Sequence, residues 1–165
     1  MYHLDVAMAD RGRAAVEPPT LALDPVLDFM RLLWGIEHGL QSASKRMETA
    51  LGITGPQRLV LRIVARFPGL SAGDVARVVR LHPSTLTGIL QRLERKGLLV
   101  RESDPGDSRR VRLKVRPDAR PFIRQSGATI ESVVARALTR MPAAQVRHAR
   151  GVLAAVADAL ERHDA

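Results

Sequence analysis

The order of proline and glycine breaks within residues 71–116 constrains this chain more than any other feature. Ser71, with Asp74 three residues later, resembles a capping box at the start of a short helix. Pro83 suits the first turn of a second helix, and Gly97 stops that helix where a left-handed cap is usual. The spacing predicts two short helices joined by a tight turn, which is a helix-turn-helix motif.

The residues after this motif predict a β-hairpin. A short first strand is expected at residues 98–100, a loop over 103–110 and a second strand at 111–115. Apolar residues in the second strand alternate with cations such as Arg112 and Lys114. The hairpin should therefore present one basic face.

The second helix of the motif, residues 83–96, has two faces when its residues are placed about 100° apart. Four apolar residues fall on the side expected to be buried: Leu86, Ile89, Leu90 and Leu93. The other side carries small, polar and positive candidates for DNA binding: Ser84, Thr85, Thr87, Gly88, Gln91 and Arg92. Gly88 permits close approach, and the hydroxyl and amide groups can bond to phosphates or base edges in a major groove.

The positive charge of the chain is concentrated around this motif. The full sequence has a formal net charge of +9, and residues 80–116 carry ten basic and four acidic residues. Such a cluster indicates a nucleic-acid partner, because neutralising phosphates releases counterions; the alternative is a solvated face without a partner. Arginine enters narrow minor grooves, so we expect Arg109 or Arg110 to read DNA shape, with Asp107 orienting the guanidinium. The alternative role for Asp107 and Arg109 is a surface ion pair within a turn.

Amphipathic helices flank the motif on both sides. Apolar residues recur at helical spacing from Asp24 to about residue 50, over residues 54–67, and again over 117–140 and 142–162. The first and the last two of these helices carry apolar faces that a small winged domain cannot cover. We therefore expect a second copy to cover them in a homodimer; the alternative is a monomer with a helical cap.

The expected fold is mainly α with a small β-hairpin wing: a winged helix-turn-helix with N- and C-terminal dimerisation helices. Four segments are expected. They are a flexible N-terminal arm (1–22), an N-terminal dimerisation helix (23–53), a winged DNA-binding domain (54–116) and C-terminal dimerisation helices (117–165).

The composition excludes or weakens several other classes of protein. The sequence has no cysteine, which excludes disulfides, thiolate catalysis and cysteine-ligated metals. The five histidines lack metal-binding spacing, so neither a metal nor a cofactor is expected. No apolar stretch is long enough for a membrane span or a signal peptide, so we expect a cytoplasmic protein without a membrane partner.

Residues 69–73 match the G-x-S-x-G pattern that surrounds the serine nucleophile of many hydrolases. That motif needs a preceding strand and a large parallel sheet, whereas here a helix is expected before it. Ser71 is better explained as a helix cap. We therefore expect no catalytic residues and no enzyme activity.

With these motifs in place, the sequence resembles the MarR (multiple antibiotic resistance regulator) family of transcriptional regulators over about residues 24–163. The most specific stretches are residues 83–87, 90–98 and, at the wing, 104–110. Three departures from the family pattern are His82 for an acidic cap, Val115-Arg116 for a Leu-Thr pair, and Pro142 for a Ser or Thr cap. The resemblance implies a homodimer with interlocked terminal helices that binds a pseudo-palindromic operator and often responds to a small aromatic acid.

The resemblance also implies an effector pocket between the dimerisation helices and the winged domain. The residues that could face it are Phe29, Arg31, Trp34, His38 and Arg62, with Arg66 as an alternative to Arg62. An apolar cavity with one cation would suit a small aromatic carboxylate. The alternative is that Trp34, the only tryptophan, and His38 are core residues.

We therefore expect a ligand-responsive repressor that binds double-stranded DNA with sequence specificity. Its recognition helix, residues 83–96, is expected in the major groove and its wing, residues 103–110, in the minor groove. The alternative is an architectural protein that binds DNA without sequence preference; uncharged polar residues such as Gln91 favour base readout. A protein-interaction module would not need the concentrated positive charge.

Overall fold

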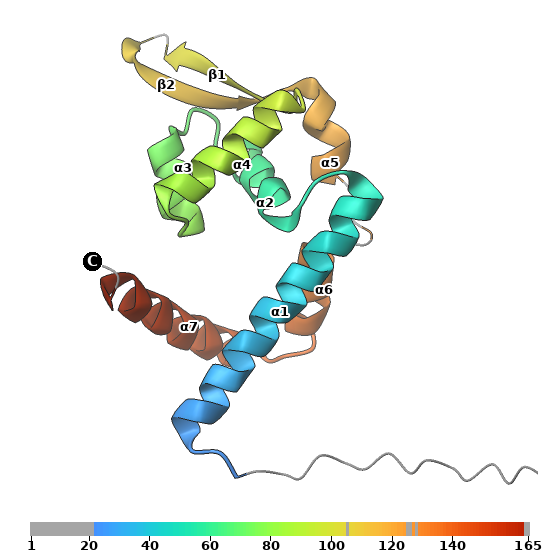
Figure 1. The fold of residues 1–165 in the computed structure, drawn as a ribbon, viewed down its shortest axis with the longest axis vertical. Coiled ribbons are helices and arrows are strands. Elements are labelled where there is room, and N and C mark those ends of the chain that lie inside the picture. The colour runs from blue at the N-terminus through green and yellow to red at the C-terminus, as the bar shows by residue number, and fades with distance from the viewer. Residues whose placement is uncertain (1–21, 105, 125–126, 128, 164–165) are drawn as a thin grey trace, which may run out of the picture.

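The computed structural model describes residues 22–104, 106–124, 127 and 129–163, so nearly all of the expected arm (1–22) lies outside the described residues. In chain order the elements are α1 (Pro25–Leu51), α2 (Gly55–Arg66), α3 (Ala72–Val79), α4 (Pro83–Arg95), β1 (Leu99–Asp104), β2 (Asp107–Val115), the 3-10 helix η1 (Pro117–Ala119), α5 (Arg120–Arg124), α6 (Ile130–Leu138) and α7 (Ala143–His163). Figure 1 shows α2 to α5 and the hairpin gathered at one end of α1, with α6 lying along α1. The predicted class, mainly helical with one antiparallel hairpin, is confirmed.

Helix α1 begins and ends where the sequence indicates. The Asp24 carboxylate accepts hydrogen bonds from the backbone amides of Val26 and Leu27 at 2.9 and 3.1 Å. These bonds satisfy amides that have no partner within the helix. At the other end Gly52 adopts the left-handed conformation (φ 74°), which glycine tolerates well, and the chain turns towards α2.

The helix-turn-helix is built from α3 and α4. The Asp74 amide donates to the Ser71 hydroxyl at 3.2 Å, and the Ser71 amide donates to the Asp74 carboxylate at 3.0 Å, which is the predicted capping box. The hydrogen bonds from Ser71, together with Arg77, lower the pKa of Asp74 to about 2. Arg80 ends α3 in the left-handed region (φ 53°), a conformation uncommon for a residue with a side chain.

One apolar core lies beneath α4. The four apolar residues of α4 that the sequence assigns to the core are 6% exposed or less. They pack with buried residues of α2, α3 and the hairpin: Val60, Leu61, Val64, Val75, Leu99 and Leu113. The core therefore fixes α4 against the rest of residues 54–116, which we call the winged region.

The strands of the hairpin are longer than predicted. β1 runs through Asp104 and β2 begins at Asp107, so most of the segment expected as a loop (103–110) is strand. Serine and aspartate favour turns, but pairing between the two strands overrides that preference. β1 packs against α4, whereas β2 packs against α2 and α3.

The single helix predicted over residues 117–140 is wrong, because this segment is interrupted. η1 and α5 end at Arg124, and α6 begins only at Ile130. The Thr129 hydroxyl accepts a hydrogen bond from the Ser132 amide at 3.3 Å and so caps the new helix. Within the described ranges, no helix combines the length and the apolar composition needed to cross a lipid bilayer.

Candidate nucleic-acid interface

The face of α4 opposite the core lies on the surface. Five of the candidate DNA-binding residues have exposed side chains: Ser84, Thr85, Thr87, Gln91 and Arg92. A Cβ added at Gly88 would meet no atom within 4 Å, so open space lies outside the helix at this position. The structure therefore brings all six candidates of α4 onto one accessible, small and polar surface.

The polar side chains at the start of α4 are partly engaged with the helix itself. The Thr87 hydroxyl donates to the Pro83 carbonyl oxygen at 2.8 Å. Nδ1 of His82 accepts a hydrogen bond from the Ser84 amide at 3.3 Å, so this histidine caps the helix. Among the described residues, Gln91 has no side-chain hydrogen bond and can turn towards a partner.

Two polar contacts tie the helix-turn-helix to the long helices. The Lys96 ammonium donates to the Gly52 carbonyl oxygen at 2.6 Å, which joins the end of α4 to the end of α1. Arg80, in the turn before α4, forms ion pairs with Asp158 and Glu161 near the end of α7. The orientation of α4 is therefore coupled to both long helices.

The wing tip has an irregular register. Ser103 pairs with Val111 but Asp104 pairs with Asp107, so residues 108–110 have no partner on β1. The Arg110 Nε lies 3.7 Å from a carboxylate oxygen of Asp107, an ion pair within the tip. The side chain of Arg109 lies outside the described part of the chain.

The outer face of the hairpin is less positive than predicted, because acidic residues of β1 pair with cations of β2. Arg112 forms an ion pair with Asp104, and Lys114 lies 3.1 Å from Glu102. A hydrogen bond from the Gly106 amide lowers the pKa of Asp104 against the opposing effect of burial, and Arg112 adds to this lowering. The openly basic face expected from the alternation is thus partly neutralised.

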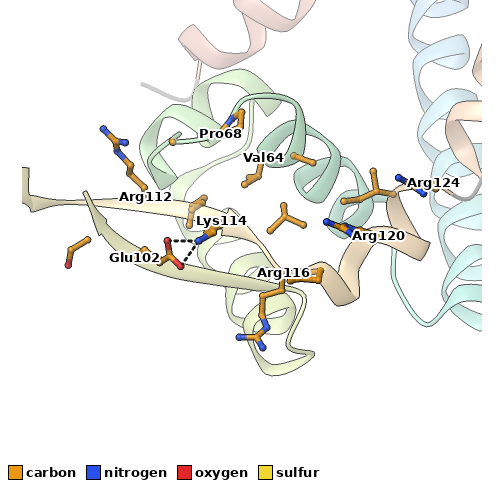
Figure 2. A pocket seen from close by; sticks show the side chains of 15 residues that line it. Val64, Pro68, Glu102, Arg112, Lys114, Arg116, Arg120 and Arg124 are labelled. Carbon is orange, nitrogen blue, oxygen red and sulfur yellow. Dashed lines mark hydrogen bonds and ion pairs between the residues drawn. The ribbon is translucent and has the colours of Figure 1, made fainter. Parts of the chain in front are cut away.

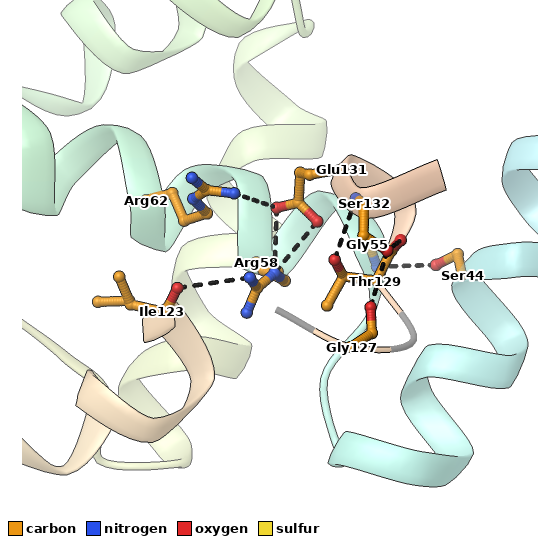
Figure 3. A network of polar contacts seen from close by, with 9 residues as sticks. All are labelled: Ser44, Gly55, Arg58, Arg62, Ile123, Gly127, Thr129, Glu131 and Ser132. Atoms are coloured by element: carbon orange, nitrogen blue, oxygen red, sulfur yellow. Dashed lines mark hydrogen bonds and ion pairs between the residues drawn. The ribbon is translucent and has the colours of Figure 1, made fainter. Parts of the chain in front are cut away.

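A polar junction joins the winged region to α6 (Figure 3). The Nε of Arg58 donates to both carboxylate oxygens of Glu131 at 3.0 and 3.2 Å, and Arg62 approaches the same carboxylate at 3.3 Å. Burial favours protonation of Glu131, but its own backbone amide and the two arginines outweigh this effect, so the pKa of Glu131 lies below its ordinary value. The ionised carboxylate therefore holds α6 against α2.

Three helices meet closely beside this junction. The Gly55 amide donates to the Ser44 hydroxyl at 2.9 Å. A Cβ on Gly55 would lie 2.4 Å from the terminal carbon of Ile130, so a larger residue here would require the Ile130 side chain to move. The start of α2 is thus packed directly against both.

The residues expected around an effector are not brought together in the described chain. Phe29 and Trp34 line an apolar hollow between α1 and α7. Arg31 instead pairs with Asp28 on the surface, His38 is exposed, and Arg62 is engaged by Glu131. Arg66, the alternative cation, lies over the ring of Phe67 at 5.6 Å.

Arg58 is a buried residue of the polar junction that sequence reasoning missed. Its side chain is among the largest that are fully buried, although arginine is seldom buried without a partner. Its burial could have been inferred from the sequence, because Arg58 stands three residues before Leu61 and six before Val64, on the apolar side of α2. Its partner Glu131 could not be inferred, since the two lie far apart in the sequence.

Comparison with known proteins agrees with this geometry. A model of the MarR family matches residues 51–110. The HTH-type transcriptional repressor Rv2887 of Mycobacterium tuberculosis is 28% identical over 133 residues, covering 81% of this chain and 94% of that protein. A Thauera aromatica protein named "Putative transcriptional regulatory protein for hcr operon" is 31% identical over 121 residues, covering 73% of this chain and 70% of that protein.

Two solved structures share the fold. The PcaV transcriptional regulator from Streptomyces coelicolor, solved with its natural ligand, matches 85% of this chain and 99% of its own, with 27% identity and a TM-score of 0.68. The S. aureus MepR–DNA complex matches 80% of this chain and 97% of its own, with 19% identity and a TM-score of 0.67. The capped helix-turn-helix, the wing and these relatives show that the chain belongs to the MarR family and is a DNA-binding transcriptional regulator, not an enzyme.

Proposed function

We propose that this regulator represses transcription by binding a pseudo-palindromic operator as a homodimer. The observation that carries the proposal is the accessible polar face of α4, held rigidly by the four buried apolar residues beneath it. The resemblance to a mycobacterial protein named as a repressor supports repression. Residues 54–116 are then the DNA-binding unit, and residues 23–53 and 117–165 form the dimer interface.

The long helices support the homodimer. Their apolar residues are between 37% and 67% exposed in the single chain: Val26, Met30, Trp34, Leu40, Val133, Val134, Leu138, Leu153 and Leu160. So much apolar surface on neighbouring helices is unusual for a monomer. A second copy related by two-fold symmetry would cover it and place the two α4 helices on successive turns of DNA.

In this proposal the residues of the interface divide their roles. Ser84, Thr85, Thr87 and Gln91 contact bases or phosphates in the major groove, and Gly88 lets the backbone approach. Arg92, like Gln91, reaches base edges. Arg109 and Arg110 enter the minor groove at the wing tip, and Asp107 orients them.

The test is selection of bound fragments from a genomic DNA pool against random competitor DNA at two salt concentrations. An enriched inverted repeat is the expected result. Salt-sensitive binding without an enriched sequence would contradict specific regulation and favour the architectural alternative. No binding at either salt concentration would remove the DNA role altogether.

Two variants separate the roles of helix and wing. Gln91→Ala should change base preference at one operator position by about 1–3 kcal/mol. Arg109→Ala should weaken binding to all sequences and lower the salt slope by about one. Arg140→Ala, which removes an exposed cation outside α4 and the wing, is the matched control once sedimentation has shown that this variant still dimerises. An unchanged salt slope in Arg109→Ala would remove the wing from the proposal.

We also propose that the regulator responds to a small aromatic acid. The resemblance to a regulator solved with its natural ligand supports this response. Phe29 and Trp34 would provide an apolar wall in the hollow between α1 and α7. Aromatic acids that bind should change the melting temperature of the protein and its affinity for the operator; a panel without effect on either would contradict the response.

A further inference from the structure

A second hollow lies away from α1, between the C-terminal end of α2, strand β2 and the start of α5 (Figure 2). Its volume is about 700 Å³, within the range of sites that hold small organic molecules. The lining includes the buried side chains of Val64 and Leu113 and the half-buried side chain of Ile123. The hollow therefore offers an apolar floor large enough for a hydrocarbon ring.

The rim of this hollow is strongly positive. One acidic residue, Glu102, lines it. The cations that line it are Arg112, Lys114, Arg116, Arg120 and Arg124. Glu102 is engaged by Lys114, and Arg112 is engaged by Asp104. In Figure 2 Arg120 extends into the space from the side opposite Lys114, whereas Arg116 turns away.

Arg120 and Arg124 are the cations left for a ligand. In the parts of the chain that the structure describes, neither has an ion pair or a side-chain hydrogen bond. They stand one turn apart at the two ends of α5, and like charges at this spacing repel each other. An anion bound between them would remove this repulsion and gain charge-assisted hydrogen bonds.

We propose that this hollow binds an amphipathic organic anion, with its apolar body against Val64 and Ile123 and its anionic group on Arg120 and Arg124. The site is separate from the hollow that Phe29 and Trp34 line, because the two share no residue. It also leaves the DNA-facing side of α4 open, since none of the residues that line the hollow belongs to α4.

A ligand in this hollow can influence the wing through Arg112. That side chain lines the hollow and pairs with Asp104, next to the wing tip. A ligand whose body displaces the Arg112 side chain from Asp104 would loosen the tip and weaken operator binding. Binding of the anion stands without any DNA role; only this effect on the operator rests on the proposed function.

The test is calorimetric titration of the full chain, without DNA, with three probes. Benzoate has an aromatic ring and a negative charge, acetate has only the charge, and benzamide has only the ring. Benzoate should bind at least about tenfold more tightly than acetate or benzamide, because the apolar floor and the two arginines each contribute to the binding free energy. Equal binding of benzoate and benzamide would overturn the role of the cations.

Two variants locate the site. The double substitution Arg120→Gln and Arg124→Gln should lower benzoate affinity about tenfold or more, while the control Arg140→Gln should leave it unchanged. Both changes are on exposed side chains, so the fold should be retained, and circular dichroism checks this. Full benzoate affinity in the folded double variant would overturn the proposal.

Trp34 gives an independent check, because it is the only tryptophan and lines the other hollow. Its emission is excited at a wavelength that benzoate does not absorb. We expect part of the calorimetric curve to proceed without a change in this emission, because benzoate then fills the hollow between α2, β2 and α5 and not the one beside Trp34. An emission change that parallels the whole calorimetric curve would place all bound benzoate between α1 and α7 and overturn the assignment. Titration with operator DNA distinguishes the anion site from the proposed regulatory function. If the protein binds the operator but not benzoate, only the anion site is contradicted. If it binds benzoate but not the operator, only the regulatory function is contradicted.

Discussion

Helices α4 and α7 both carry an apolar stripe, but only the stripe of α4 is covered within the chain. Leu86, Leu90 and Leu93 are 1% exposed or less, whereas Leu153 and Leu160 of α7 are 46% and 61% exposed. An apolar helical face is stable in water only against another apolar surface. The winged region is therefore complete in one chain, and the long helices depend on surface that the chain does not supply.

This difference separates two kinds of stability. Residues of the core should contribute equally at every protein concentration, because all their contacts are intramolecular. Residues on the open faces of α1, α6 and α7 should contribute only when copies associate, since association depends on concentration. The ion pair of Arg58 and Glu131 lies within one chain, so its contribution should not depend on concentration, and it connects the winged region to α6.

Leu90→Ala should have the largest effect. The residue is fully buried, and its truncation leaves a cavity beneath the recognition helix, so we expect a loss of about 2–5 kcal/mol in the free energy of unfolding. Urea denaturation measures it. The loss should be the same in dilute and concentrated protein; a loss that disappears at high concentration would break the distinction between the two regions.

Glu131→Gln should come next, with a loss of about 1.5–3 kcal/mol. The amide cannot compensate the charge of Arg58, which is 1% exposed and would remain in the protein interior. Thermal unfolding measures the loss, and Glu48→Gln, an exposed acid on α1, is the control. Equal stability of the two variants would show that the junction does not couple the regions.

Leu160→Ala tests the open face directly. The exposed side chain should contribute less than about 0.5 kcal/mol to the stability of a single chain. In a dimer its burial matters, so the dissociation constant should rise about tenfold, equivalent to about 1.4 kcal/mol. Sedimentation over a dilution series measures this. A dissociation constant equal to that of the unmodified chain would exclude this part of α7 from the interface.

The smallest effect concerns the capping box in the winged region. The pKa of Asp74, lowered to about 2 from 3.8, means that its contribution to stability is complete above pH 3.8 and is lost as the pH falls through about 2. Ser71→Ala should move this pKa back towards the ordinary value, because it removes the largest stabilising hydrogen bond. A carboxyl-carbon NMR titration measures both values, and an unmoved pKa would assign the shift to the Ser71 backbone amide and Arg77.

Most of the winged region could be predicted because its signals are local. The cap at Ser71, the start of α4 at Pro83 and the stop at Gly97 each depend on a few neighbouring residues. The break between α5 and α6 was missed because the apolar periodicity of residues 117–140 continues across Gly127 and Thr129. Strand lengths were missed because the pairing of β1 with β2 outweighs the turn preference of single residues.

In the candidate site, too, local features could be predicted from the sequence and long-range pairings could not. The faces of α4 follow from helical geometry alone, so its buried and exposed residues are placed as predicted. The pairing of Arg112 with Asp104 and of Arg62 with Glu131 depends on distant partners, and helical or strand period carries no information about it. The cations therefore could be counted from the sequence, but those already neutralised could not be distinguished from those available to a ligand.

The irregular register at the wing tip also bears on insertions and deletions. Residues 108–110 have no partner on β1, so one residue added or removed there would leave the pairs from Leu99 to Ser103 in place. The same change between residues 113 and 115 would turn Leu113 out of the core and Arg112 into it, because side chains alternate along a strand. Tip length can thus vary among related regulators while the base of the wing must keep its length.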